Sequence, residues 1–137
     1  MSVTYYKMNQ ILDNEFGSTS YTPASTLYLG LSTTTCTVSG TGYTEPTGGS
    51  YARVAITNNK SSFSTAASGS LTNSGTLTFT ESTASWGTIT YVIITDSPTT
   101  SAGNVLYYEA LTTAKTVQTA TTVLFAAGAI TISMSNT

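Results

Sequence analysis

The chain has 137 residues, which is the usual length of one domain and is enough to bury a hydrophobic core. Six acidic and four basic residues leave a net charge of −2, and this argues against binding nucleic acid through a basic surface. The chain has one cysteine, Cys36, and hence no internal disulfide, and it has no apolar run of the ~18 residues that a membrane span needs.

The N-terminal segment has the spacing of an amphipathic helix over residues 4–16. Its apolar residues recur at i, i+3, i+7 and i+11, and they are Tyr5, Met8, Leu12 and Phe16. Gly17 is a natural end for the helix. We therefore divide the chain into a helix over 1–17 and one β-domain over 18–137. The apolar stripe needs a cover, and we expect it to dock on another subunit rather than on its own sheet.

The rest of the chain predicts short strands separated by turn residues. The expected strands are 26–32, 51–57, 75–80, 86–96, 104–111, 115–117, 122–125 and 129–134. Over a third of the chain is serine or threonine, and threonine is common on the outer face of strands. Seven or eight short strands with no helical pattern between them indicate an all-β fold, an antiparallel β-sandwich resembling a jelly roll.

The strand over 86–96 is the most apolar of the set, and we expect it to be central. Both of its faces are apolar from Tyr91 to Ile94, so both must be covered. One face would meet a second sheet, and the other would meet a helix or a neighbouring subunit. Trp86, at the start of this strand, is expected to be buried, and Asp96 ends the strand with turn residues.

The loop over 33–50 is the first place to look for a contact surface. Loops longer than about 12–15 residues are usually functional. Tyr43 and Glu45 are its candidate interface residues. Arg53, in the following strand, either faces solvent with its stem along the sheet or forms an ion pair with Glu45 or Asp96 that holds a loop in place.

The sequence lacks the residues that most catalytic and metal sites need. Without histidine a serine has no ordinary activating base, and a transition metal has too few ligands. The six acidic residues are scattered along the chain, which gives no pattern for calcium or for a glycosidase pair. We expect no enzyme activity, no cofactor and no metal.

Several motifs together resemble a known family. They are LYLGLS, TEPTGGSYARVAIT, WGTITYVIITD, GNVLYYEALTTAKTV and FAAGAITISM, in that order after an N-terminal helix. This order is similar to a family of small virion structural proteins of tailed bacteriophages, some labelled tail-fibre proteins and some decoration proteins. The resemblance covers nearly the whole chain, and it implies a virion protein without catalytic residues that is assembled in the host cytoplasm.

Three functions are compatible with this resemblance. We favour a capsid cement (decoration) protein that binds the major capsid protein lattice as a homo-oligomer, most simply a trimer, because the chain lacks the heptads or long repeats of a fibre shaft. The second is a structural protein of the tail, the tail fibre or the tail tip. The third is a host-surface or glycan-binding module. None of these involves a membrane or nucleic acid.

Overall fold

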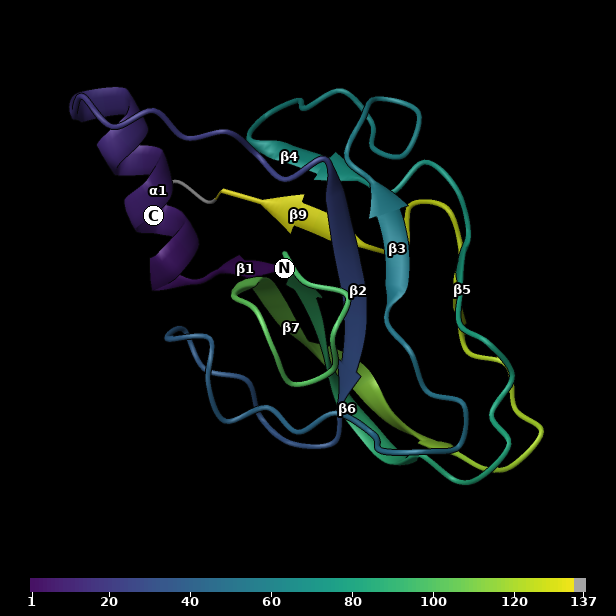
Figure 1. Cartoon of the computed structure of the whole chain (residues 1–137). Coiled ribbons are helices and arrows are strands. Elements are labelled where there is room, and N and C mark those ends of the chain that lie inside the picture. Colours follow the sequence, from purple (N-terminus) through teal and green to yellow (C-terminus); the bar gives the residue numbers. More distant parts are fainter. Residues whose placement is uncertain (135–137) are drawn as a thin grey trace.

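The structure, a computed structural model, describes residues 1–134, which form one helix and nine strands (Figure 1). The predicted all-β fold with an N-terminal helix is confirmed. In chain order the elements are β1 (Ser2–Val3), α1 (Tyr5–Phe16), β2 (Thr26–Ser32), β3 (Val54–Thr57), β4 (Ser70–Thr72), β5 (Leu77–Thr78), β6 (Gly87–Thr95), β7 (Val105–Val117), β8 (Leu124–Phe125) and β9 (Thr131–Ser133).

The main sheet has five strands in the order β1-β7-β6-β2-β3, and every neighbouring pair is antiparallel. The strand expected to be central, β6, lies in the middle of this sheet. Ile93 of β6 is opposite Gly30 on one side and Tyr108 on the other. Its side chain is fully buried, as the apolar character of both faces required.

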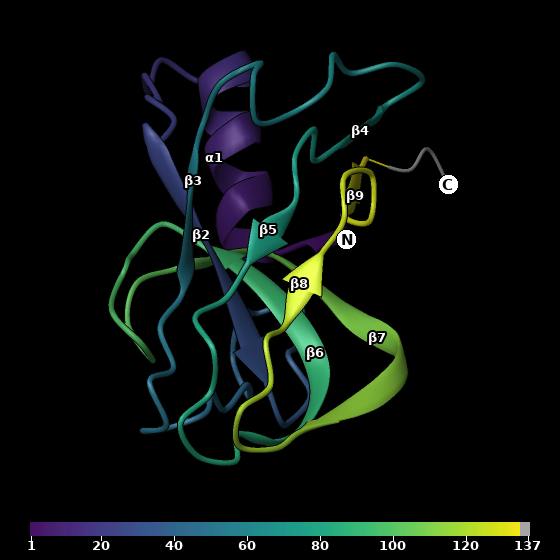
Figure 2. The same cartoon turned by 90° about the vertical axis from the view of Figure 1, so that its right-hand side faces the viewer.

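Two short ribbons, β4-β9 and β5-β8, cover one face of the main sheet. Figure 2 shows β5 and β8 side by side in front of the sheet. The larger core lies between these layers, and its buried members include Leu29, Leu31, Ile56, Phe63, Phe79, Trp86, Val92, Ile94 and Ile130. The second layer is thus built from ribbons too short to stand alone, which are stable because they pack on the sheet.

The opposite face of β6 is covered by the chain's own loop over 33–50. Cys36 and the half-buried Tyr43 from this loop pack against Ile93 and Val105. The sequence predicts a helix or a neighbouring subunit there; within the chain the loop takes that place, and a contact with a neighbouring subunit stays a prediction. A long loop covers the face because it carries enough apolar side chains to do so and satisfies its polar groups with its own hydrogen bonds, for example Thr33 N–H to the Thr44 carbonyl at 2.9 Å.

Several strand boundaries differ from the prediction. The strand expected over 51–57 begins at Val54, and the one expected over 75–80 is limited to Leu77–Thr78. The two strands expected over 104–111 and 115–117 are one continuous strand, β7, which pairs with β6 on both sides of an irregular stretch between Ala110 and Lys115. The sequence analysis also missed β1 and β4, which are too short to show a period of two.

The side chains of β6 do not alternate strictly between the two faces of the sheet, because the alternation is interrupted near the middle of the strand. The register against β7 shifts between Ile89 and Tyr91, where β7 passes from Lys115 to Ala110. As a result Ile89 packs in the larger core with Val92, rather than on the face of Tyr91. Strict alternation would have put Ile89 and Tyr91 on one face, and irregular pairing of this kind is what changes the face.

Candidate functional site: an interaction surface around the N-terminal helix

Helix α1 is anchored to its own subunit through Thr4. The side chain of Thr4 caps the helix by accepting a hydrogen bond from the Lys7 backbone N–H. Its hydroxyl also lies 2.6 Å from the carbonyl oxygen of Val105, and its backbone N–H donates to the Leu106 carbonyl at 3.0 Å. Thr4 is fully buried, so these contacts hold the first turn of α1 against β7.

The strand before the helix adds to this anchor. Ser2 and Val3 pair with Tyr108 and Tyr107 of β7, and Met1 is buried in the larger core. The terminal ammonium of Met1 forms an ion pair with Glu109 at 3.1 Å. Residues 1–4 thus join the start of the helix to the sheet of the same chain, while the docking of its apolar stripe on another subunit stays a prediction.

The face that α1 turns inward is not the predicted apolar stripe. Lys7 is the buried residue of the helix, at 8% exposure, whereas Tyr5, Leu12 and Phe16 are 55%, 53% and 84% exposed. Thr4 holds the first turn of the helix, and three of the four stripe residues point outward while Met8 is half-buried. The periodicity had identified the apolar face correctly but could not show which way that face points.

The outward stripe borders an open groove of about 580 Å³ between α1, β1, β7 and β9. The groove is lined mostly by apolar side chains, which include Val3, Met8, Ile11, Leu12, Val38, Tyr108 and Met134. An exposed apolar surface of this kind marks a contact site in soluble proteins. We call the outward side chains Tyr5, Leu12 and Phe16, together with Met8 in the groove, the helix surface.

Thr4 provides a direct test of the anchor. Replacing Thr4 by Val removes the hydroxyl that caps α1 and leaves the shape of the side chain nearly unchanged. We expect the free energy of unfolding to fall by about 1–3 kcal/mol, because a buried cap and its hydrogen bonds are lost. Urea unfolding followed by circular dichroism measures this, with Thr4→Ser, which keeps the hydroxyl, as the matched control. Equal stability of the two variants would contradict the anchor.

The second group of predicted residues meets in a buried ion pair. Arg53 donates from Nε to Glu45 Oε1 at 2.9 Å and from Nη2 to Glu45 Oε2 at 2.7 Å. Neither side chain is exposed. Of the two interpretations of Arg53, the ion pair with Glu45 is the one that the structure contains. Glu45 is thus not available as a contact residue on the loop, which corrects the sequence analysis.

This pair connects three parts of the chain. Nη1 of Arg53 donates to the carbonyl oxygens of Ser97 and Ala102 at 2.7 and 2.9 Å, and the backbone N–H of Ser101 donates to Glu45 Oε2 at 2.6 Å. The loops over 33–50 and 96–104 are thereby joined to each other and to the start of β3. Gly30 leaves room for the carboxylate, since a Cβ there would lie 2.8 Å from Glu45 Oε1.

Both ionisable partners around Glu45 are held in their usual protonation states. Burial raises the pKa of Tyr51 far above its ordinary value, so its hydroxyl stays protonated and donates to Glu45 Oε1 at 2.8 Å. Burial opposes the charge on Arg53, but the hydrogen bonds and negative charge of Glu45 outweigh it and raise the pKa of Arg53. The cluster is therefore a stable structural clamp rather than a proton-transferring site.

Asp96 and Trp86, the other two candidate structural residues, have separate partners. Asp96 accepts hydrogen bonds from the backbone and side-chain N–H groups of Asn104 at 2.7 and 2.8 Å, which closes the loop between β6 and β7. Trp86 is 3% exposed, as predicted, and its Nε1–H donates to the Gly49 carbonyl at 2.8 Å. Trp86 thus joins the core to the end of the 33–50 loop.

Residues 1–134 were searched for a reactive thiol, a metal-binding group and a membrane-spanning helix. Burial raises the pKa of the Cys36 thiol to about 11, so it stays protonated and unreactive near neutral pH. Within residues 1–134 no three His, Cys, Asp or Glu side chains come together as a group that could hold a metal ion. No helix in the same residues is long and apolar enough to cross a membrane. The helix surface remains as a candidate site, because it gathers several of the exposed large apolar side chains.

Comparison with known protein families identifies a family of phage structural proteins. The sequence matches the family described as podophage GP4 fiber I protein gp80, over residues 2–133. The chain belongs to this gp80 fibre family. It is therefore a structural protein of a tailed-phage virion, as the resemblance of the motifs implied. The match to the gp80 family includes both β1 and α1. A search of curated proteins found no match.

The residues that anchor α1 were missed by the sequence analysis. Thr4 stands directly before the first helical residue, and a threonine at that position is a recognised helix-start signal. This signal was sufficient to predict Thr4 as the residue that caps the N-terminus of α1. Nothing in the sequence distinguished Lys7 from an exposed lysine, because its burial depends on Tyr21 and on β7, which are distant in the chain.

Proposed function

We propose that this protein is a non-enzymatic structural subunit of a virion fibre, assembled through its helix surface. The observation that carries the fibre assignment is the match to the gp80 fibre family over residues 2–133. The structure supports a mechanical role, because the ion pair of Arg53 with Glu45 and the core around Trp86 hold the long loops in fixed positions. A rigid body of this kind transmits load without a conformational cycle.

The helix surface supports self-association. Its exposed side chains are large and apolar, and Phe16 at 84% exposure is the most accessible of them. Large apolar and aromatic side chains with few charges form the centres of protein interfaces. We propose a homo-oligomer, most simply a trimer, in which α1 of each subunit contacts a neighbour while its inner face stays on its own β7.

Charge on this surface should prevent assembly without unfolding the subunit. We expect the double variant Leu12→Lys and Phe16→Lys to run as a monomer in light scattering, since two lysines cannot be buried in an apolar contact. Asn14→Lys together with Asp13→Lys, on the same helix, is the control and should keep the oligomer. Thermal unfolding of both should stay close to that of the native protein. An unchanged mass for the first variant would place the interface elsewhere.

A capsid cement protein bound to the major capsid protein is the second candidate. The observation in its favour is the compact shape of residues 1–134, whose longest elements are a 12-residue helix and a 13-residue strand, rather than a fibre shaft. Copy number per virion separates the two candidates, when measured by quantitative mass spectrometry of purified particles. Copies in the hundreds support the capsid lattice, and copies from a few to some tens support a fibre.

A further inference from the structure

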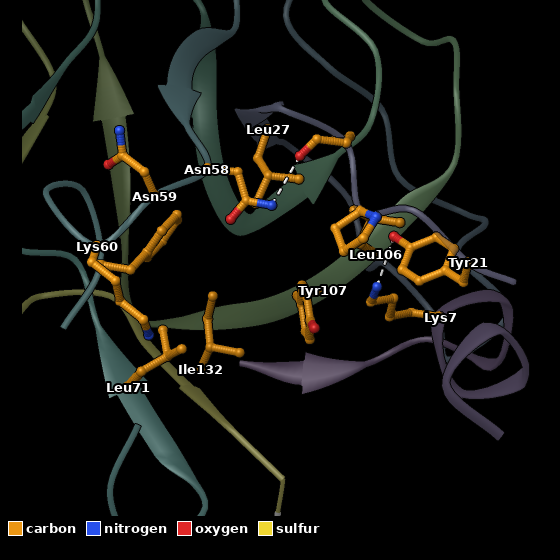
Figure 3. A pocket seen from close by; sticks show the side chains of 13 residues that line it. Lys7, Tyr21, Leu27, Asn58, Asn59, Lys60, Leu71, Leu106, Tyr107 and Ile132 are labelled. Carbon is orange, nitrogen blue, oxygen red and sulfur yellow. Dashed lines mark hydrogen bonds between the residues drawn. The ribbon is translucent and has the colours of Figure 1, made fainter. Parts of the chain in front are cut away.

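A pocket of about 380 Å³ lies between α1, β7 and the second layer (Figure 3), and no side chain of the helix surface lines it. Lys7 and Tyr21 form one end of it, and Lys60 and Leu71 form the other. The side chains between these ends are mostly apolar and include Leu27, Phe63, Leu106, Tyr107 and Ile132. A volume above about 300 Å³ is sufficient for a small organic ligand.

The unusual feature of this pocket is the ammonium group of Lys7. Its side chain is among the few buried charged groups of the protein, and its Nζ donates to the hydroxyl of Tyr21 at 2.8 Å. The same Nζ lies 4.0 Å from the centre of the Tyr21 ring. Among residues 1–134, no carboxylate lies within ion-pair distance of it. An ammonium has three donors, and among residues 1–134 the Tyr21 hydroxyl is the acceptor that Lys7 Nζ contacts.

Buried charges in proteins are normally paired, so this arrangement indicates an anionic partner. Two other buried cations among residues 1–134 illustrate the rule, because Arg53 is matched by Glu45 and the Met1 ammonium by Glu109. The lining of the pocket contains no Asp or Glu, and it contains a second cation, Lys60. Burial raises the pKa of Tyr107, so its phenol also stays neutral near neutral pH. The charged side chains that line the pocket are therefore both lysines.

We propose that this pocket binds an amphipathic carboxylate, with its anionic group at Lys7 and its apolar body along Leu27, Leu71 and Ile132. The mostly apolar lining favours a hydrocarbon body for the ligand. The carboxylate comes either from a free aliphatic acid or from an acidic side chain between apolar residues of a partner protein. Both present the same chemistry to Lys7, and two probes distinguish them.

Octanoate is the probe for the free acid, and octanol is its uncharged counterpart. We expect octanoate to shift the methyl resonances of Leu27, Leu71 and Ile132 in NMR titrations of the intact protein. Octanol should bind at least about tenfold more weakly, which is the loss expected when a charge-assisted hydrogen bond is removed. A capped peptide with one glutamate between two leucines is the second probe. Tighter binding of the peptide identifies a partner protein as the source, and tighter binding of octanoate identifies a free acid.

Variants test the role assigned to Lys7. Lys7→Met keeps the apolar stem and should reduce the affinity for octanoate to that for octanol. Lys115→Met makes the same change of charge at an exposed site on β7 and should leave binding unchanged. Equal binding of octanoate and octanol to the native protein would overturn the proposal, and so would octanoate binding that is unaffected by Lys7→Met. The comparison in the native protein decides the question even if Lys7→Met fails to fold.

Discussion

Replacing Arg53 by Met should lower the free energy of unfolding by about 3–5 kcal/mol, which is the cost of leaving one partner of a buried ion pair without its counter-charge. In this variant the carboxylate of Glu45 stays enclosed, with the Tyr51 hydroxyl and the Ser101 backbone N–H as its remaining donors. The carbonyl oxygen of Ala102 also loses its donor, and that of Ser97 keeps the Thr95 hydroxyl alone. Chemical unfolding followed by circular dichroism measures the effect.

The control for this variant is Lys115→Met, which removes one positive charge from an exposed position. It should change stability by less than about 0.5 kcal/mol, as surface substitutions usually do. If Arg53→Met were as mild as the control, the clamp between the loops would contribute nothing measurable. Cleavage by a protease gives a second measurement, since the loops over 33–50 and 96–104 should become susceptible in Arg53→Met first.

Replacing Trp86 by Ala should cost about 3–5 kcal/mol as well, for a different reason. Trp86 packs edge-on against Tyr51 and Phe79, with ring centres 5.3 and 6.2 Å away, so its removal opens a cavity among aromatic rings. It also leaves the Gly49 carbonyl without its indole donor. Since Trp86 is the single tryptophan of the chain, unfolding has to be followed by circular dichroism rather than by tryptophan fluorescence.

The variant Trp86→Phe separates the contribution of aromatic packing from that of the hydrogen bond to the Gly49 carbonyl. It retains an aromatic ring in the core and loses the hydrogen bond to Gly49, so we expect a smaller cost of about 1–2 kcal/mol. A loss below about 1 kcal/mol for Trp86→Ala would show that Trp86 is not a core residue. A similar loss for both variants would assign the effect to the hydrogen bond instead of the packing.

The loop over 33–50 is a second surface that could take part in assembly. The long loop over 33–50 covers the second face of β6, and it is held at Glu45 by Arg53 and at Gly49 by Trp86. A loop fixed at several points loses little conformational entropy when a partner binds to it. The loop is thus a preformed surface beside the helix surface, and substitutions at its exposed threonines would test its part in assembly separately from α1.

The sequence alone was sufficient to identify the fold class and the central strand. Alternating apolar residues and turn residues report local geometry directly, and β6 was recognised because both of its faces are apolar. The missing histidine was also visible at once, and it is the reason that we expect no common catalytic or metal site. The motifs were long enough to indicate the family that the match over residues 2–133 then established.

The tertiary structure decided what lies against each of these elements. Whether α1 turns Lys7 or Phe16 inward depends on the bond between Thr4 and β7, about a hundred positions later in the chain. Glu45 seemed available as a contact residue because nothing near it in the sequence shows that Gly30, Tyr51 and Arg53 surround it. Periodicity reports which residues share a face, but the partner of that face is set by long-range packing, which no local pattern contains.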